Sequence, residues 1–458
     1  MIDGKVDTAA QQLLSRQIAM IPPHVPTSTY TPPGDSKKAG LDKQKPEDRE
    51  YLRKVCDVFG ESVAKSMAQG AQKLAVTRDD TVDEARHHLR FAVVRADKFC
   101  DTETTGKVVA AVQGYLSRRP DESGQAFVVY GRSGAGKTYL MSEIMVEHIK
   151  EQAGKGCVVI RFLGTSPASS SVQTLLSSLC KQLRRCYDKE DEVPSDFKEL
   201  RAYFLKALAG WPSVDQPLSL FIDSVDQLDD SNAGRRLEWL PVSELSPHVR
   251  LVVSTLPDHP EFQCLSLLKK GLGHTGEGSA SSCIVKVETI SDHLGVLRHL
   301  LELEGRTATA DQIAAVDAAF RNRTDDDAAG TPLWLTIVAQ ILALWTSYEA
   351  VKFEISPSVQ GLIMDLFERL EATHGKHLVR AVLAFLTLCR QSGVSETEIN
   401  HLLSLDDAVL ADIYEWWVPS MRTCPPLVLT MLLAELAPYL SRRGDGSGQE
   451  LLFWYHRQ

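Results

Sequence analysis

The eight residues at 131–138 constrain the fold of this chain more than any other feature. They read GRSGAGKT, the full GxxxxGK[ST] pattern, directly after the apolar run AFVVY and directly before the helical pattern YLMSEIMVEHI. A glycine-rich loop between a strand and a helix turns its backbone N–H groups inward, and the helix adds the positive end of its dipole. The segment therefore predicts a loop that binds the phosphates of a nucleotide.

This loop supplies most of the predicted ligand contacts. Lys137 is expected to face solvent before a ligand enters and then to reach the outer phosphates, and the Thr138 hydroxyl is placed to ligate magnesium. The glycines allow the backbone conformations and the close approach that a triphosphate requires. The sequence thus predicts a site for ATP or a closely related nucleoside triphosphate with Mg²⁺, formed by Gly131, Ser133, Gly134, Ala135, Gly136, Lys137 and Thr138.

A second acidic site follows a later apolar run. The segment 218–228 reads LSLFIDSVDQL, so Asp223 stands at the carboxyl end of a strand, as in a Walker B motif. Asp223 is predicted to hold the magnesium ion directly or through water, and Asp226 to orient or deprotonate the attacking water as the catalytic residue. The alternative for Asp226 is a capping or solvated loop carboxylate.

Short apolar runs alternate with helical patterns from residue 125 onward, as in a parallel sheet with crossover helices. The fourth run ends in Ser254 and Thr255, whose hydroxyls stand where such a sheet can sense the γ-phosphate. After about residue 291 helices dominate, and no further strand is predicted before the last ten residues. The fold class is therefore α/β, a doubly wound parallel sheet with predicted strands at 126–130, 157–162, 218–222, 250–254 and 283–287.

The segment before the sheet has a different character. Residues 21–48 are rich in proline, glycine, serine and charge, which indicates a linker or a disordered arm. Apolar positions then recur every three or four residues from Leu52 to Leu74, which predicts one helix, and a second helix is expected at 81–99. The basic cluster around His87 and His88 is interpreted as solvated helix surface, because adjacent histidines point to different faces.

Composition excludes several classes of protein. A net charge of -10 and a pI near 5.8 give no electrostatic attraction to nucleic acid or to an anionic membrane. Nine cysteines without a CxxC pair argue against a secreted disulfide framework and against a zinc site. No apolar run approaches the roughly 18 residues that cross a bilayer. The sequence predicts a cytoplasmic protein without membrane insertion.

Taken together, these residues resemble the NACHT group of signal-transduction P-loop NTPases, which belong to the STAND class and are related to AAA+ modules. The segments RFLGTSPASSSVQTLLSSLCKQL and RLVVSTLP are similar to those of NACHT proteins with WD or tetratricopeptide repeats, including nephrocystin-like proteins. The resemblance extends from about residue 81 to the end. It implies a P-loop domain followed by a helical subdomain and a winged-helix domain, which together respond to ATP and ADP.

The resemblance adds two candidate nucleotide contacts. Pro332 stands in the place of the group's nucleotide-contacting proline, although a proline at the first position of a helix is the structural alternative. His456 in WYHRQ matches a histidine that senses the β-phosphate of ADP. Two positions depart from the group: Leu256 stands where many members carry an arginine, and Phe99 runs into Cys100 without the glycine-arginine signature.

The resemblance also implies a domain organisation. Members of this group usually continue into repeats, so the chain is expected to be a truncated product or a fragment, with protein partners bound through the missing repeats or by self-association. The expected domains are an arm at 1–48, a helical segment at 49–120, the nucleotide-binding domain at 121–290, the helical subdomain at 291–358 and an incomplete winged-helix-like domain at 359–458.

The predicted function is an ATP/ADP-dependent signalling or scaffold switch with slow Mg²⁺-dependent hydrolysis. A nonhydrolytic assembly platform remains open. So does an AAA-like remodelling ATPase, whose arginine finger would be Arg235 or Arg236, although a solvated pair is the plainer interpretation. A phosphoryl transferase would need an arginine-rich lid, for which Arg184 and Arg185 on an amphipathic helix are the nearest residues.

Overall fold

The chain divides into two compact units, Met1–Asp79 and Asp80–Gln458. In the first unit, α3 (Pro46–Leu74) confirms the first predicted helix. Residues 1–44 of the predicted arm lie outside the described residues. Glu47 and Asp48 lie in its first turn, where carboxylates stabilise the positive end of the helix dipole. The computed structural model describes residues 45–74, 79–118, 124–260, 262–274, 283–288, 290, 292–322, 331–345, 354–389, 393–414, 422–444 and 450–454.

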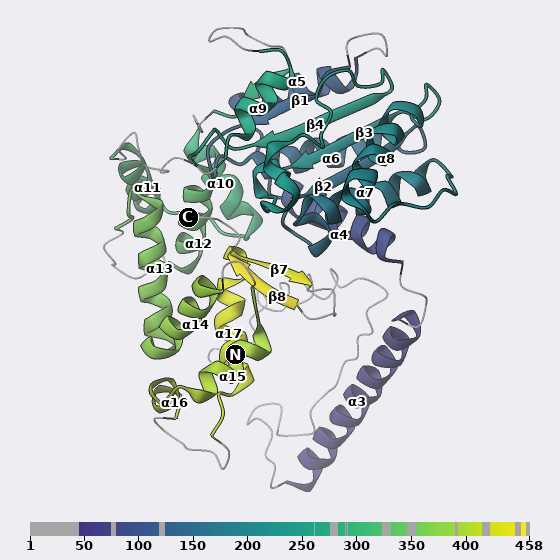
Figure 1. Ribbon diagram of the computed structural model, residues 1–458. Coiled ribbons are helices and arrows are strands. Elements are labelled where there is room, and N and C mark those ends of the chain that lie inside the picture. Colours follow the sequence, from purple (N-terminus) through teal and green to yellow (C-terminus); the bar gives the residue numbers. More distant parts are fainter. Residues whose placement is uncertain are drawn as a thin grey trace. The chain divides into compact units, whose positions relative to one another are not determined.

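The second unit is built on a five-stranded sheet whose strand pairs are all parallel (Figure 1). The strand order β2-β3-β4-β1-β5 places β1, which leads into the P-loop, between β4 and β5. The five predicted strands are confirmed to within one residue at each end, as β1 (Phe127–Tyr130), β2 (Cys157–Phe162), β3 (Leu218–Asp223), β4 (Val249–Thr255) and β5 (Ile284–Lys286).

Helices cover both faces of this sheet, so the doubly wound α/β prediction is confirmed. Successive strand residues point to opposite faces, and Phe127 and Val128 accordingly belong to two different apolar clusters. The cluster around Phe127 includes α4 (Asp80–Ala96), α5 (Glu103–Leu116) and α6 (Lys137–Gln152). The cluster around Val128 includes α7 (Val172–Cys186), α8 (Phe197–Gly210) and α9 (Cys264–Gly271). Short 3-10 turns η1 (Pro167–Ser169), η2 (Val225–Gln227) and η3 (Ser231–Arg236) follow β2 and β3.

Helices dominate the rest of the unit, as predicted. α10 (His293–Leu303), α11 (Ala310–Arg321) and α12 (Pro332–Leu344) share one apolar cluster centred on the fully buried Trp334. A further cluster is formed by α13 (Val359–His374), α14 (Lys376–Leu388), α15 (Glu396–Leu405), α16 (Asp407–Ile413) and α17 (Pro426–Leu436), after which η4 (Ala437–Tyr439) follows.

A three-stranded antiparallel sheet accompanies this last cluster. Its order is β6 (Val394–Ser395), β8 (Glu450–Trp454), β7 (Leu440–Gly444). The expectation of no strand before the last ten residues is wrong for β6 and β7. The sheet and its helices are compatible with a winged-helix domain, which stays a prediction, and the segment with His456 lies outside the described residues.

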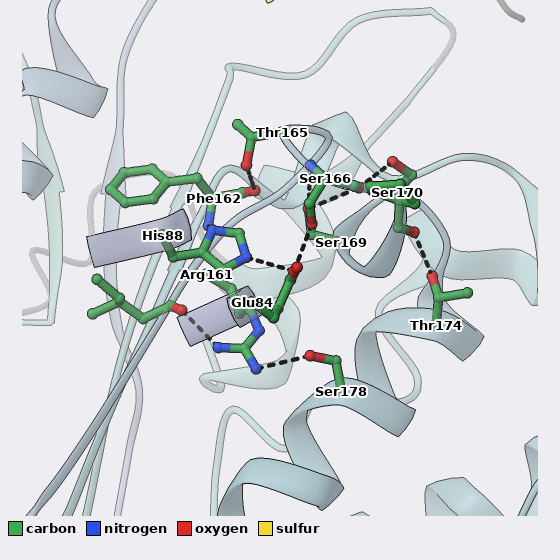
Figure 2. Close-up of polar contacts among 12 residues, drawn as sticks. Glu84, His88, Arg161, Phe162, Thr165, Ser166, Ser169, Ser170, Thr174 and Ser178 are labelled. Carbon is green, nitrogen blue, oxygen red and sulfur yellow. Dashed lines mark hydrogen bonds and ion pairs between the residues drawn. The ribbon is translucent and has the colours of Figure 1, made fainter. Parts of the chain in front are cut away.

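β2 is an edge strand, and α4 covers its open edge. The backbone N–H of Phe162 donates to Nδ1 of His88 (3.1 Å), whose Nε2 therefore carries the proton and donates to Glu84 (2.9 Å) (Figure 2). Glu84 also accepts from the Ser166 hydroxyl (2.5 Å). The prediction of a solvated surface is thus wrong for His88, which is fully buried, because an unpaired strand N–H attracts a ring nitrogen.

The protonation states of His88 and Glu84 follow from their burial and their hydrogen bonds. Burial lowers the pKa of His88 to about 4, so the ring is neutral at pH 7. Burial raises the pKa of Glu84, but the bonds from His88 and Ser166 and the charge of Arg161 together lower it to about 2. The guanidinium of Arg161 is fully buried and donates to Ile160 O and to the Ser178 hydroxyl, each at 2.9 Å. α4 is therefore joined to the strand beside the second acidic motif.

We expect His88 to make the folded state sensitive to mild acid. The unfolded chain takes up a proton near pH 6.5 and the folded chain only near pH 4, so stability is lost as pH falls through that window. The loss is about 3 kcal/mol. Denaturant unfolding at several pH values should show a flatter pH dependence for His88→Leu than for the parent, whereas His401→Leu on exposed α15 surface should leave the slope unchanged. Parallel slopes for the parent and His88→Leu would contradict this assignment.

Candidate nucleotide-binding site

The loop at 131–136 has the backbone that its glycines predict. Gly134 and Gly136 adopt φ values of +72° and +82°, in the left-handed region that favours glycine. A Cβ on Gly134 would lie 3.0 Å from Cβ of Leu333, and one on Gly136 would lie 3.0 Å from Cγ of Pro332. The structure therefore brings Pro332, which also begins α12, against the loop. Its role as a nucleotide contact stays a prediction.

Lys137 is buried, and the expectation that it faces solvent is wrong. Its Nζ donates to the backbone oxygens of Gly131 (2.8 Å) and Arg132 (3.0 Å). Burial lowers its pKa, while the carboxylates of Asp226 and Asp223 oppose that shift. Loop carbonyls attract an ammonium group in the same way as phosphate oxygens, which explains the difference. The loop thus holds its cation in place through two neutral acceptors.

Thr138 and Asp223 meet across the end of the sheet. The Thr138 hydroxyl donates to Oδ2 of Asp223 (2.8 Å), and the Ser254 hydroxyl donates to Oδ1. Burial raises the pKa of Asp223, and the two hydroxyl donors and the charge of Lys137 oppose that shift. A hydroxyl beside a buried carboxylate is an all-oxygen donor pair of the kind that Mg²⁺ prefers. These two residues fit the predicted metal site.

Asp226 is buried rather than solvated. Its Oδ1 accepts from the Ser224 hydroxyl (2.5 Å) and from the backbone N–H of Leu256 (3.0 Å), and its Oδ2 accepts from Nε2 of Gln227 (2.6 Å). Of the two alternatives for Asp226, the solvated loop carboxylate is therefore wrong, whereas the capping carboxylate agrees with the bond from the Leu256 N–H. These three donors fix the orientation of the carboxylate. Leu256, which stands where many members of the NACHT group carry an arginine, contributes its backbone N–H. The catalytic role of Asp226 stays a prediction.

Thr255 places an unsatisfied hydroxyl beside the loop. It is fully buried, and its Oγ1 has no hydrogen-bond partner within the described part of the chain. Its backbone oxygen accepts from the N–H of Gly131 (3.4 Å). A buried hydroxyl without a partner is costly, and a phosphate oxygen would satisfy it. The contact from Ser254 to Asp223 was missed, because both strand-end hydroxyls fit the sequence pattern equally.

A pocket that the sequence did not reveal lies beside the loop. It is lined by the 98–105 segment, by the loop with Tyr139, by Glu288 and Ile290, and by residues of α10 and α12, including Pro332 and Gln340. Most of its lining is apolar, with a few polar groups, as in sites that take the nucleoside part of a cofactor. The pocket is assembled from segments about 240 residues apart, which no local pattern reports.

Other candidates do not join the site. Arg235 donates to Leu228 O (2.7 Å) and pairs with Asp230 (3.3 Å), and its side chain is only 18% exposed, so it is not the solvated residue that was expected. Within the described ranges there is no cluster of three metal-ligating side chains. Nor does any helix among the described residues combine the length and the apolar character that a membrane span needs.

The chain is similar in sequence to known proteins. The family described as Nephrocystin 3, N-terminal, matches residues 104–255, from α5 to the end of β4. NACHT domain- and WD repeat-containing protein 1 of Mus musculus is 28% identical over 472 aligned residues, which cover 100% of this chain and 29% of that protein. NACHT and WD repeat domain-containing protein 2 of Homo sapiens is 30% identical over 426 residues, which cover 90% of this chain and 23% of that protein.

Solved structures align with the chain only at low similarity. The Walker-type ATPase PABY2304 of Pyrococcus abyssi aligns with a TM-score of 0.33 and 13% identity, over 78% of this chain and 94% of that one. A score this low carries no information about function. The matches in sequence extend over nearly the whole chain, and they agree with the P-loop and the parallel sheet described above. The chain is therefore homologous to the NACHT and WD repeat-containing proteins, and it spans less than a third of the length of each of these relatives.

Proposed function

We propose that this chain binds ADP and ATP with Mg²⁺ and acts as a nucleotide-dependent switch of the STAND class in signalling or scaffold assembly. The observation that carries the proposal is the contact between Thr138 and Asp223 (2.8 Å) at the base of the P-loop. The Thr255 hydroxyl supports it, because it is buried and a phosphate oxygen would supply the acceptor that it lacks within the described residues. The buried ammonium of Lys137 supports it as well, because its charge lies at the loop that would bind the phosphates.

Each residue of the site has a distinct part in this proposal. Lys137 exchanges its two carbonyl acceptors for phosphate oxygens, since bonds between two charged groups are the stronger ones. Thr138 and Asp223 would hold the Mg²⁺ ion, which would supply positive charge to neutralise the phosphates. Asp226 orients the attacking water and accepts its proton. Hydrolysis by this arrangement resets the switch slowly.

The helical subdomain gives the switch a means to respond. A ligand shifts a conformational equilibrium only as far as its affinities for the two states differ. Pro332 and Leu333 touch the P-loop glycines, and the backbone N–H of Leu333 donates to Gly134 O (3.4 Å), so α12 completes the site. In the proposal ADP favours this closed arrangement and ATP exchange opens it. Protein partners then bind, either through WD repeats like those for which the relatives are named or through self-association.

His456 is proposed to hold the closed state by donating to the β-phosphate of ADP. Replacing it with alanine removes a charge-assisted bond of about 1.5 to 3 kcal/mol, so His456→Ala should release ADP roughly tenfold faster or more. ATP affinity should change less, because Lys137, Thr138 and the loop amides remain. Stopped-flow release of a fluorescent ADP at matched Mg²⁺ measures this, with His401→Ala as the exposed control. Equal ADP release from the parent and His456→Ala would exclude the closed-state role.

A single-turnover assay tests the proposed function against its alternatives. The folded chain is mixed with a substoichiometric amount of Mg·ATP, and bound and cleaved nucleotide are followed together. The switch predicts binding followed by slow cleavage to ADP. Binding without cleavage would favour the nonhydrolytic platform, and cleavage that accelerates with self-assembly would favour a remodelling ATPase.

A further inference from the structure

One hydrogen bond joins the wall of the nucleoside pocket to the carboxyl-terminal region. Gln340 lines that pocket from α12, eight residues and about two turns after Pro332. Its Oε1 accepts from the hydroxyl of Tyr439. Tyr439 ends η4, and the next residue, Leu440, begins β7. A pocket residue is thus tied directly to the start of the small antiparallel sheet.

Tyr439 also lies between two apolar clusters. Its ring packs against the cluster of α10–α12, which borders the pocket, and against the cluster of α13–α17. Burial raises the pKa of the Tyr439 hydroxyl to about 12, so the group keeps its proton and donates. A carboxamide whose oxygen is occupied offers its N–H donors to further partners. Tyr439 therefore fixes which end of the Gln340 amide remains available for a ligand.

We propose that Gln340 recognises the base of the bound nucleotide through its amide N–H groups, and that Tyr439 couples this recognition to docking of the region from α13 to β8. The inference rests on the proposed function and names a specificity residue and its positioning partner. Ring nitrogens and carbonyl oxygens of a base are the acceptors that such a donor fits. Hydrogen bonds in a chain strengthen one another, so a base on Gln340 tightens the bond from Tyr439.

Coupling of this kind is reciprocal. If the base stabilises the bond between Tyr439 and Gln340, then that bond stabilises the bound base by the same factor. Loss of the Tyr439 hydroxyl should therefore lower the affinity for ligands that contain a base, and it should not change the affinity for ligands that contain only phosphates. A purely structural tie would affect both ligands equally, because the P-loop does not depend on the base.

The experiment compares ADP with inorganic pyrophosphate, each with Mg²⁺, by titration calorimetry. Tyr439→Phe removes the hydroxyl and keeps the ring. The substitution should weaken the affinity for ADP roughly threefold to tenfold, which is the size of effect expected for one hydrogen bond. The affinity for pyrophosphate should not change. Tyr414→Phe is the matched control, since the Tyr414 hydroxyl donates to Thr423 O in the same region and Tyr414 does not line the pocket. It should change neither ligand.

A second readout follows the carboxyl-terminal region itself. ADP should slow amide hydrogen exchange in β7 of the parent, and this protection should be lost in Gln340→Leu, which keeps the side-chain bulk and removes the amide. The inference is overturned if Tyr439→Phe binds ADP with the affinity of the parent, or if the substitution lowers the affinities for ADP and for pyrophosphate by the same factor. If the folded parent binds neither ligand, the proposed function itself fails, which the parent alone reveals before any variant is measured.

Discussion

Lys137→Ala is expected to weaken binding of Mg·ATP by roughly a hundredfold or more. The ammonium would form charge-assisted bonds to two phosphate groups, and each such bond contributes about 1.5 to 3 kcal/mol. Because Nζ also donates to Gly131 O and Arg132 O in this structure, the substitution removes two internal bonds as well. A modest loss of stability should therefore accompany the loss of affinity. Titration with a fluorescent ATP analogue measures the affinity.

Two further variants separate these effects. Lys137→Met keeps the buried aliphatic stem and should lose affinity to the same extent with a smaller loss of stability. Lys150→Ala removes an exposed lysine from the other end of α6, where Nζ pairs with Glu147 (2.7 Å), and should bind Mg·ATP like the parent. Parental affinity in a folded Lys137→Met would reject residues 131–138 as the phosphate site.

We expect Asp223, at the end of β3, and Asp226, after it, to affect different steps when they are replaced. Asp226→Asn keeps the size of the side chain and loses the proton acceptor, so it should bind Mg·ATP normally and cleave it roughly 10² to 10⁴ times more slowly. Asp223→Asn replaces the buried carboxylate that accepts from Thr138 and should instead weaken Mg²⁺-dependent binding. Affinities with Mg²⁺ and with EDTA, together with single-turnover cleavage, measure both effects.

The control for this pair is Asp230→Asn. Asp230 lies in the same stretch of chain but is 82% exposed and pairs only with Arg235 among the ion pairs of the described residues, so binding and cleavage should be parental. Parental cleavage by Asp226→Asn would remove this residue from the catalytic step. If Asp223→Asn and Asp226→Asn had the same defect, the division between metal ligand and base would be wrong.

The local parts of the site could be predicted because each lies within one continuous pattern. The five strands of the parallel sheet are short apolar runs, and each ends where loop residues begin. Residues 131–138 and Asp223 follow two of those runs directly. Because the carboxyl ends of parallel strands share one edge of the sheet, the proximity of Thr138 and Asp223 can be predicted from the sequence alone.

Other features depend on contacts that local patterns do not contain. His88 looks like a surface residue among charged neighbours, and only the open edge of β2 explains its burial. The burial of Lys137 does not follow from the sequence, because the carbonyl acceptors of its own loop carry no sequence signature. The pocket with Gln340 depends on the approach of α12 to the P-loop. The strand β7 reads LSRRG, with no β-branched or aromatic residue, and pairs with β8 regardless.

The central claim is that the folded chain binds a nucleotide at its P-loop, and one equilibrium titration tests it most directly. A fluorescent ADP is titrated with Mg²⁺ into the parent chain and then displaced by ATP, by ADP and by pyrophosphate. We expect saturable binding that both nucleotides displace, with pyrophosphate the weaker competitor because it leaves the pocket beside Gln340 empty. A folded parent chain that shows no saturable binding of any of these ligands would contradict the account.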